Sequence, residues 1–226
     1  MKPLILATLL CSGLWAQATK STAPAKKAPA AAGGGSLLNP ATLRATAPED
    51  YKAEFVTTKG NFVIEVHRDW APFGADRFYN LVRNGFFTNA AFFRVVPNFM
   101  VQFGLSANPA VNKAWQNANL RDDPVKQSNK RGYITFAQTS APNSRSTQVY
   151  INFKDNTFLD SQRFAPFGEV VEGMDVVDKI TSQYGETPDQ GHITEEGDAY
   201  ISKNFPNIDK IKSARILPAA GAPDKK

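Results

Sequence analysis

The chain has 226 residues, of which 42% are hydrophobic and 21% charged, and this composition excludes a disordered or fibrous protein. A formal charge of +5 would favour nucleic-acid binding if the basic residues lay in a folded domain, but seven of the 26 lie outside residues 49–217. The 19 basic and 20 acidic residues of that middle region make it nearly neutral, which argues against a nucleic-acid partner.

The start of the chain has the features of a secretory signal. Lys2 precedes an apolar run over residues 4–10 that is too short to span a bilayer, and small residues follow up to Ala18. We therefore expect a signal peptide over residues 1–18, cleavage after Ala18 and export to the periplasm. The single cysteine, Cys11, lies in this segment without the small preceding residue of a lipoprotein site. We expect it to be part of the apolar run, which leaves the mature chain without a disulfide.

Two further segments have the composition of flexible appendages. Residues 19–48 consist mostly of Ala, Pro, Gly, Ser, Thr and Lys, and such a segment buries too little apolar surface to offset the entropy of ordering. We expect a flexible linker there and a flexible tail over 218–226, with the folded domain over 49–217. No other apolar run approaches the roughly 18 residues of a membrane helix, so we expect no stable membrane insertion.

Hydrophobic periodicity predicts short strands and two helices in the domain. Alternation with period two on both sides of a Lys-Gly-Asn turn indicates a β-hairpin over residues 53–58 and 62–67. Apolar residues then repeat at three and four between Pro72 and Gly85, which predicts a helix over 71–84. The later elements are a helix over 174–182 and short strands over 92–96, 99–103, 133–137, 148–153, 164–171 and 212–217. This pattern favours an all-β-dominated barrel or sandwich capped by two α-helices.

Two long segments of the domain, 105–132 and 183–209, have no clear period. We expect loops there, either functional or lying outside the core. The acidic pair Asp122-Asp123 is interpreted as solvated loop charge, and Arg145, in a Ser-Arg-Ser sequence, as part of a polar turn. Because the chain has only two histidines, His-based metal or hydrolytic chemistry has little support.

The segment from Phe92 to Gly104 carries the most informative residues. A strand pair there could present one cation, one amide and two adaptable apolar side chains together, from Arg94, Phe99, Met100 and Gln102. An arginine among aromatic residues is more often a structural ion pair, but an Arg followed by Phe-Met-x-Gln at this spacing resembles the cyclophilin family of peptidyl-prolyl isomerases. The resemblance continues through four more blocks and covers roughly residues 52–217; the blocks are 132–138, 146–151, 158–160 and 167–174.

The resemblance implies a closed, antiparallel, eight-stranded β-barrel with two capping helices, and an isomerase that needs no metal or cofactor. It implies that Arg94 is the catalytic cation, with Gln102 beside it, and that Gln102 and Gln148 are amides that bind the substrate backbone. Ala137 and Gln138 would belong to the neighbouring peptide groove. The implied walls of the proline pocket are Phe99, Met100, Tyr150, Phe158 and Leu159.

The sequence departs from the family pattern at several of these positions. Phe93 stands where many members have His, and Tyr150 replaces a pocket Phe, which adds a hydroxyl that needs a partner. Phe158 stands where many members have Trp, and this predicts weak inhibition by cyclosporin. The pocket His has no match, since Arg163 or Phe164 falls at its position. The stretch between Ala137 and Gln148 is one residue longer than usual, so the match of Gln138 is less specific than that of Gln148.

Together with the signal sequence, the resemblance implies an exported, monomeric peptidyl-prolyl isomerase that acts on proline-containing polypeptides during folding. The alternative is a chaperone module that binds proline peptides in the same groove without catalysis, which the missing pocket His and the altered aromatic residues favour. Nucleic-acid binding is a third hypothesis, which the nearly neutral domain makes the weakest.

Overall fold

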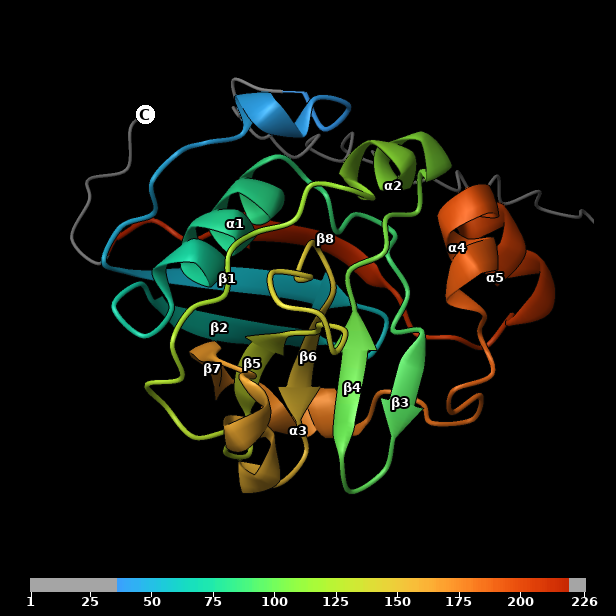
Figure 1. Cartoon of the computed structure of the whole chain (residues 1–226). Helices are drawn as coiled ribbons and strands as arrows, with labels where there is room; N and C mark the ends of the chain where they lie inside the picture. The colour runs from blue at the N-terminus through green and yellow to red at the C-terminus, as the bar shows by residue number, and fades with distance from the viewer. Residues whose placement is uncertain (1–35, 220–226) are drawn as a thin grey trace, which may run out of the picture. The chain divides into compact units, whose positions relative to one another are not determined.

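The computed structural model describes residues 36–219, which contain eight strands in one antiparallel sheet (Figure 1). The first hairpin, β1 and β2, has the predicted register, with Phe55 opposite Phe62. All eight strands coincide with runs predicted from the sequence. Their bounds are β1 Asp50–Thr57, β2 Asn61–His67, β3 Arg94–Val96, β4 Met100–Phe103, β5 Tyr133–Phe136, β6 Val149–Asn152, β7 Pro166–Glu172 and β8 Ile211–Ile216.

The strand order is β3-β4-β6-β5-β7-β2-β1-β8, so β3 and β8 are the two edges of a strongly curved sheet. The edges meet only just before these strands, at an isolated antiparallel bridge between Ala91 and Lys210. Phe92 N donates to Asp209 O at 3.0 Å and Ile211 N donates to Ala90 O at 2.8 Å. The expected closed barrel is therefore slightly overstated. The sheet is a half-barrel whose two edges are joined by one bridge, because beyond that bridge the outer edge of β3 pairs with Gly185, whose O accepts from Val95 N at 2.9 Å.

The interior of the sheet is filled by phenylalanine rings. Phe55 and Phe62 stack with their ring centres 5.1 Å apart, and Phe78 from the first helix lies 5.9 Å from Phe55. These rings are almost completely buried, as are Phe87 and Phe103. Most of the unusual number of phenylalanines therefore stabilises the core through apolar burial.

Five α-helices lie within residues 36–219, where the sequence predicted two. The two predicted helices are present as α1 Pro72–Arg83 and α3 Met174–Asp178, with α1 in the upper part of Figure 1 and α3 in the lower part. The other three, α2 Pro109–Trp115, α4 Gln190–Glu196 and α5 Asp198–Asn204, occupy the segments predicted as loops. Each has seven residues, too few for a periodic pattern to stand out. None of the helices in the described part of the chain is long and apolar enough to cross a membrane.

The segment 183–209, which contains α4 and α5, packs beside α2 (Figure 1). Asn112 Nδ2 of α2 donates to Ile193 O of α4 at 3.2 Å. The turn between α4 and α5 comes so close to α2 that a Cβ on Gly197 would lie 2.2 Å from Ala107 O, and its φ of +61° also favours glycine. The segment is thus fixed to the domain by close backbone contact.

Part of the predicted linker also contacts the domain. Ala47 N donates to Asp76 Oδ1 of α1 at 2.8 Å, and Trp115 Nε1 of α2 donates to Leu37 O at 2.8 Å. Residues 36–48 are therefore held by specific hydrogen bonds, although their composition predicts a free linker. The predicted signal peptide over 1–18, the rest of the linker and most of the tail lie outside the described residues.

Candidate active site

A cavity of about 420 Å³ is lined by side chains from β3, β4 and β6, from the loop before β6, and from α2 and α4. Its lining includes nine of the ten site residues predicted from the sequence; they are Arg94, Phe99, Met100, Gln102, Ala137, Gln138, Gln148, Tyr150 and Leu159. The fold thus brings residues from distant parts of the chain to one groove. The tenth predicted residue, Phe158, is not part of the lining.

A cation and two amides form a hydrogen-bonded chain along the groove. Arg94 and Gln102 are paired residues of β3 and β4, so their side chains lie on the same face of the sheet. Arg94 Nη1 donates to Gln102 Oε1 at 3.2 Å, and Gln102 Nε2 donates to Gln148 Oε1 at 2.7 Å. Because the side chain of Arg94 is 32% exposed, its charged group remains accessible from the cavity.

One end of the groove is an apolar pocket. Met100, Tyr150 and Leu159 form a small buried cluster at its base, and Phe99 and Phe164 pack against them. Tyr150 and Phe164 meet edge to face with ring centres 5.9 Å apart. The pocket therefore offers a rigid apolar surface of the kind that holds a compact ring such as that of proline.

Phe158 lies outside this pocket. Its side chain is 55% exposed and its ring stacks on Phe99, with ring centres 6.0 Å apart. The predicted role of Phe158 as a pocket wall does not match this placement, because the ring covers the outer side of Phe99. The position of the missing family His is filled by Phe164, which lines the cavity, while Arg163 points elsewhere and pairs with Asp122 at 3.2 Å.

The hydroxyl of Tyr150 has a protein partner below the pocket. Tyr150 Oη donates to Asn129 Oδ1 at 3.0 Å, and Asn129 Nδ2 donates to Asp160 Oδ1 at 2.8 Å. Burial raises the pKa of Tyr150 well above its ordinary value, so the group is a neutral hydrogen-bond donor. Burial alone would also raise the pKa of Asp160, but hydrogen bonds from Asn129 and Ser128 hold that pKa below its ordinary value. Asp160 is therefore an ionised acceptor that anchors the floor of the pocket.

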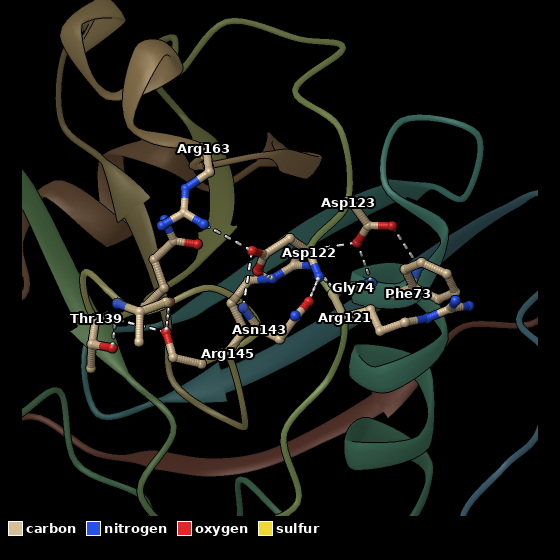
Figure 2. A network of polar contacts seen from close by, with 12 residues as sticks. Phe73, Gly74, Arg121, Asp122, Asp123, Thr139, Asn143, Arg145 and Arg163 are labelled. Carbon is tan, nitrogen blue, oxygen red and sulfur yellow. Dashed lines mark hydrogen bonds and ion pairs between the residues drawn. The ribbon is translucent and has the colours of Figure 1, made fainter.

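The loop before β6, which carries part of the groove, is anchored by a buried ion cluster (Figure 2). Arg145 Nη1 donates to Asp123 Oδ2 at 3.1 Å, and both side chains are at most 1% exposed. Asp123 also accepts hydrogen bonds from Phe73 N and Gly74 N at the start of α1. The interpretations of Arg145 as a turn residue and of Asp123 as solvated charge were therefore wrong, because tertiary packing buries both.

The second acid of the pair lies at the edge of this cluster. Asp122 accepts from Asn143 N at 3.0 Å and from Arg163 Nη1 at 3.2 Å, and its carboxylate lies 3.4 Å from Arg145 Nε (Figure 2). Its side chain is 20% exposed. Asp122 thus binds the groove loop at Asn143 and Arg145 and is not free loop charge.

A close approach of two backbones fixes the other end of that loop. Gly104, at the end of β4, has a φ of +108°, and a Cβ there would lie 2.4 Å from Thr147 O. Thr147 Oγ1 donates back to Gly104 O at 2.8 Å. Only glycine permits this contact, which places Thr147 and Gln148 beside the strand that carries Gln102.

Comparison with known proteins identifies this arrangement. The profile of the family described as "Cyclophilin type peptidyl-prolyl cis-trans isomerase/CLD" matches residues 52–206, well over half of the chain. The chain belongs to the cyclophilin family. It is therefore an enzyme of the peptidyl-prolyl cis-trans isomerase class.

Individual relatives agree with this assignment. This cyclophilin is 38% identical over 160 residues to a peptidyl-prolyl cis-trans isomerase of Acinetobacter baylyi, an alignment that covers 67% of the chain and 82% of the relative. It is 37% identical over 133 residues to peptidyl-prolyl cis-trans isomerase B of Escherichia coli, covering 56% of the chain and 81% of the relative.

A solved structure shows the same fold. The cyclophilin-type isomerase of Cryptosporidium parvum matches with a TM-score of 0.59 at 17% identity, covering 75% of this chain and 98% of that one. The same protein was also solved in the presence of the dipeptide Ala-Pro. At this identity the likeness concerns the fold alone.

The cyclophilin groove also includes residues that the sequence analysis did not single out. They are Leu105 before α2, Asn112 and Trp115 in α2, Gln116 just after it, Thr139, Ser144, Ser146 and Thr147 in the loop before β6, and Gln190 and Thr194 of α4. The capping residues Asn108 and Asp189, whose side chains accept hydrogen bonds from Ala110 N and His192 N, were the available signals for the two short helices. Nothing in the sequence indicated that α4 would border the groove.

Within the described part of the chain, the side chain of Gln138 leaves one hydrogen-bond acceptor unpaired in the wall of the groove. Its Nε2 donates to Gln162 O at 2.8 Å, while its Oε1 is buried without a hydrogen-bond partner within residues 36–219. A carbonyl oxygen in that position is suited to accept a donor from a bound peptide. Within the same described range, no group of three or more His, Cys, Asp or Glu residues is placed to hold a metal ion.

Proposed function

We propose that this cyclophilin accelerates the isomerisation of X-Pro bonds in exported proteins as they fold, with Arg94 as its catalytic cation. The observation that carries the proposal is the position of Arg94 in the cavity lining, together with Gln102 and the apolar pocket around Met100. A proline ring in that pocket would bring its nitrogen to the same groove as the guanidinium.

The reaction needs no covalent intermediate. Rotation about an X-Pro bond faces a barrier of about 18 to 20 kcal/mol, because resonance gives the C–N bond partial double-bond character. In the twisted amide the proline nitrogen regains its lone pair and can accept a hydrogen bond that it cannot accept in either planar isomer. A fixed donor beside that nitrogen therefore stabilises the transition state more than the ground states, which is what lowers the barrier.

Arg94 is suited to this role by its geometry. Its guanidinium is always charged and planar, so it can donate to the proline nitrogen and to a neighbouring carbonyl at once. Gln102 and Gln148 would hold the substrate backbone while the carbonyl before proline rotates, and Gln138 Oε1 would accept a backbone N–H. The rings of Phe99, Tyr150 and Phe164 would keep the proline ring still.

The test is NMR exchange spectroscopy on a short peptide with one Ala-Pro bond, which measures the cis-trans rate on the enzyme and the dissociation constant separately. For Arg94→Ala we expect the rate to fall by about a hundredfold while the peptide still binds, since the pocket is unchanged. The matched control is Arg131→Ala, which removes a surface arginine that pairs with Asp178 and does not line the cavity. An unchanged rate in Arg94→Ala would overturn the proposed mechanism.

The same experiment tests the alternative of a binding module. Phe164 at the position of the pocket His, and the hydroxyl of Tyr150, favour this alternative, because they change the pocket without removing its capacity to hold proline. Peptide binding by the wild-type chain with no acceleration of exchange would support a chaperone that only binds.

Export is proposed from the sequence of residues 1–18, which lie outside the described residues. Fractionation of producing bacterial cells, followed by mass spectrometry of the purified protein, measures both the compartment and the first residue. We expect a periplasmic protein that begins at Thr19 and elutes as a monomer in size-exclusion chromatography. A cytoplasmic protein that retains Lys2 would contradict export.

A further inference from the structure

The segment 183–209 reaches the candidate catalytic arginine. Its first turn lies alongside β3, where Val95 N donates to Gly185 O at 2.9 Å. Gly185 has a φ of +53°, and its own N donates to Ser182 O at 3.0 Å, so the chain turns sharply there. The next residue, Glu186, places its carboxylate against the side chain of Arg94, with Oε1 2.5 Å from Nε.

We propose that Glu186 is a positioning residue that fixes the plane of the Arg94 guanidinium for catalysis. The inference rests on the proposed role of Arg94. Glu186 does not touch the substrate. It acts through Arg94, by holding the Nε edge of the guanidinium while the arginine lines the groove.

The placement of the two acceptors around Arg94 supports this role. Glu186 binds Nε and Gln102 binds Nη1, so the planar group is held at two points, and Nη2 has no hydrogen-bond partner within residues 36–219. A guanidinium held at one point could still rotate about that contact, whereas two contacts fix its plane. Fixing an arginine before the substrate arrives lowers the entropy that is lost in the transition state.

Glu186 lies outside the space that a substrate would fill. Arg94 and Gln102 line the cavity, but Glu186 is absent from its lining, and its side chain is 60% exposed. The carboxylate therefore does not compete with a peptide for the groove. Positioning, and not inhibition, is the role that this geometry favours.

A second contact attaches the same segment to β3. Phe93, the residue before Arg94, is 2% exposed and lies in an apolar cluster with side chains of the segment, including Ile193, Ile201 and Phe205. Tyr184, two residues before Glu186, packs its ring edge to face on Phe205 with ring centres 5.1 Å apart. The turn that carries Glu186 is thus anchored to the strand that carries Arg94, and this cover explains an apolar Phe93 where many cyclophilins have His.

The experiment compares Glu186→Gln with Glu195→Gln in the full chain. The first variant removes the charge that faces Arg94 and keeps the shape of the side chain. The second removes an exposed carboxylate of α4, in the same segment, that has no ion-pair partner within residues 36–219 and does not line the cavity. Exchange spectroscopy on the Ala-Pro peptide gives the on-enzyme rate and the dissociation constant for each.

For Glu186→Gln we expect the on-enzyme rate to fall about two- to fivefold with an unchanged dissociation constant, the size of effect that fits a partly exposed ion pair. The NMR signal of the Arg94 Nε–H should also shift and exchange faster with water. Glu195→Gln should match the wild type in both measurements. An unchanged rate or an unchanged Nε–H signal in Glu186→Gln would overturn the inference, and a raised rate would show that Glu186 inhibits the enzyme.

The positioning role of Glu186 and the proposed function of Arg94 can fail independently of one another. If Arg94→Ala keeps the wild-type rate, the proposed mechanism fails whatever Glu186 does. If Arg94→Ala loses the rate and Glu186→Gln does not, Arg94 is catalytic and only the positioning role of Glu186 is wrong.

Discussion

Arg145 and Asp123 form an ion pair of 3.1 Å in which both side chains are at most 1% exposed (Figure 2). Asp123 also accepts two backbone N–H groups at the start of α1, so the pair joins the groove loop to that helix. A buried ion pair is costly to form. Removing one partner is more costly still, because the other charge is then left buried and unpaired.

Arg145→Ala should therefore lower the free energy of unfolding by about 3 to 5 kcal/mol in urea denaturation. Arg163→Ala is the matched control: Arg163 pairs with Asp122 of the same cluster, but its side chain is 44% exposed, and we expect a loss of less than about 1 kcal/mol. Equal losses in the two variants would show that burial does not decide the contribution of these arginines.

Asp160 should make stability depend on pH. Its pKa lies below the ordinary value of 3.8, because Asn129 and Ser128 donate to the ionised form. The stabilisation is therefore complete above about pH 4 and is lost as the pH falls through the lower, folded-state pKa. Asp160→Asn should cost about 1 to 3 kcal/mol at pH 7, measured by urea unfolding, and the difference from wild type should shrink between pH 4 and pH 2.

An exposed aspartate gives the control for that pH series. Asp175 pairs with Lys179 on the surface of α3, with a side chain that is 73% exposed. Asp175→Asn should hardly change the unfolding free energy at any of these pH values. A difference for Asp160→Asn that stays constant from pH 7 to pH 2 would rule out the ionised carboxylate as its cause.

Phe158 should limit the affinity for cyclosporin. Its ring is 55% exposed on the outer side of Phe99, so an indole can replace it without repacking the core. We expect weak inhibition of the wild type and tighter inhibition of Phe158→Trp, measured as the cyclosporin concentration that halves the isomerase rate. No gain in affinity would mean that another departure, such as Phe164, sets the inhibition.

The contacts of residues 36–48 predict where the stable domain begins. A chain that starts at Ser36 keeps the hydrogen bonds of Ala45 with Asn80, of Ala47 with Asp76 and of Leu37 with Trp115. A chain that starts at Glu49 loses all of them and exposes buried donors. It should be less stable by about 2 kcal/mol or more in urea unfolding. Equal urea concentrations at the midpoint of unfolding for the two chains would place the start of the stable domain at residue 49.

Much of the fold was predictable because its signals are local. The β1–β2 hairpin and α1 follow from changes of hydrophobic period, and each of these elements begins and ends within three residues of its predicted bounds. The pairing of Arg94 with Gln102 is local as well, since a three-residue connection joins their strands in one register. The short helices α2, α4 and α5 were missed, because seven residues fill barely two turns and their stability comes from packing.

The sequence by itself determined the basic ends and nearly neutral middle of the chain, its strands and the family motif around Arg94. Only the tertiary structure decided the environment of the charged side chains. Arg145 looked like a turn residue and is buried, Phe158 looked like a pocket wall and lies outside, and Glu186, 92 residues after Arg94, is its ion-pair partner. Burial and long-range ion pairs arise from packing between distant segments, and neither periodicity nor spacing along the chain records which segments will meet.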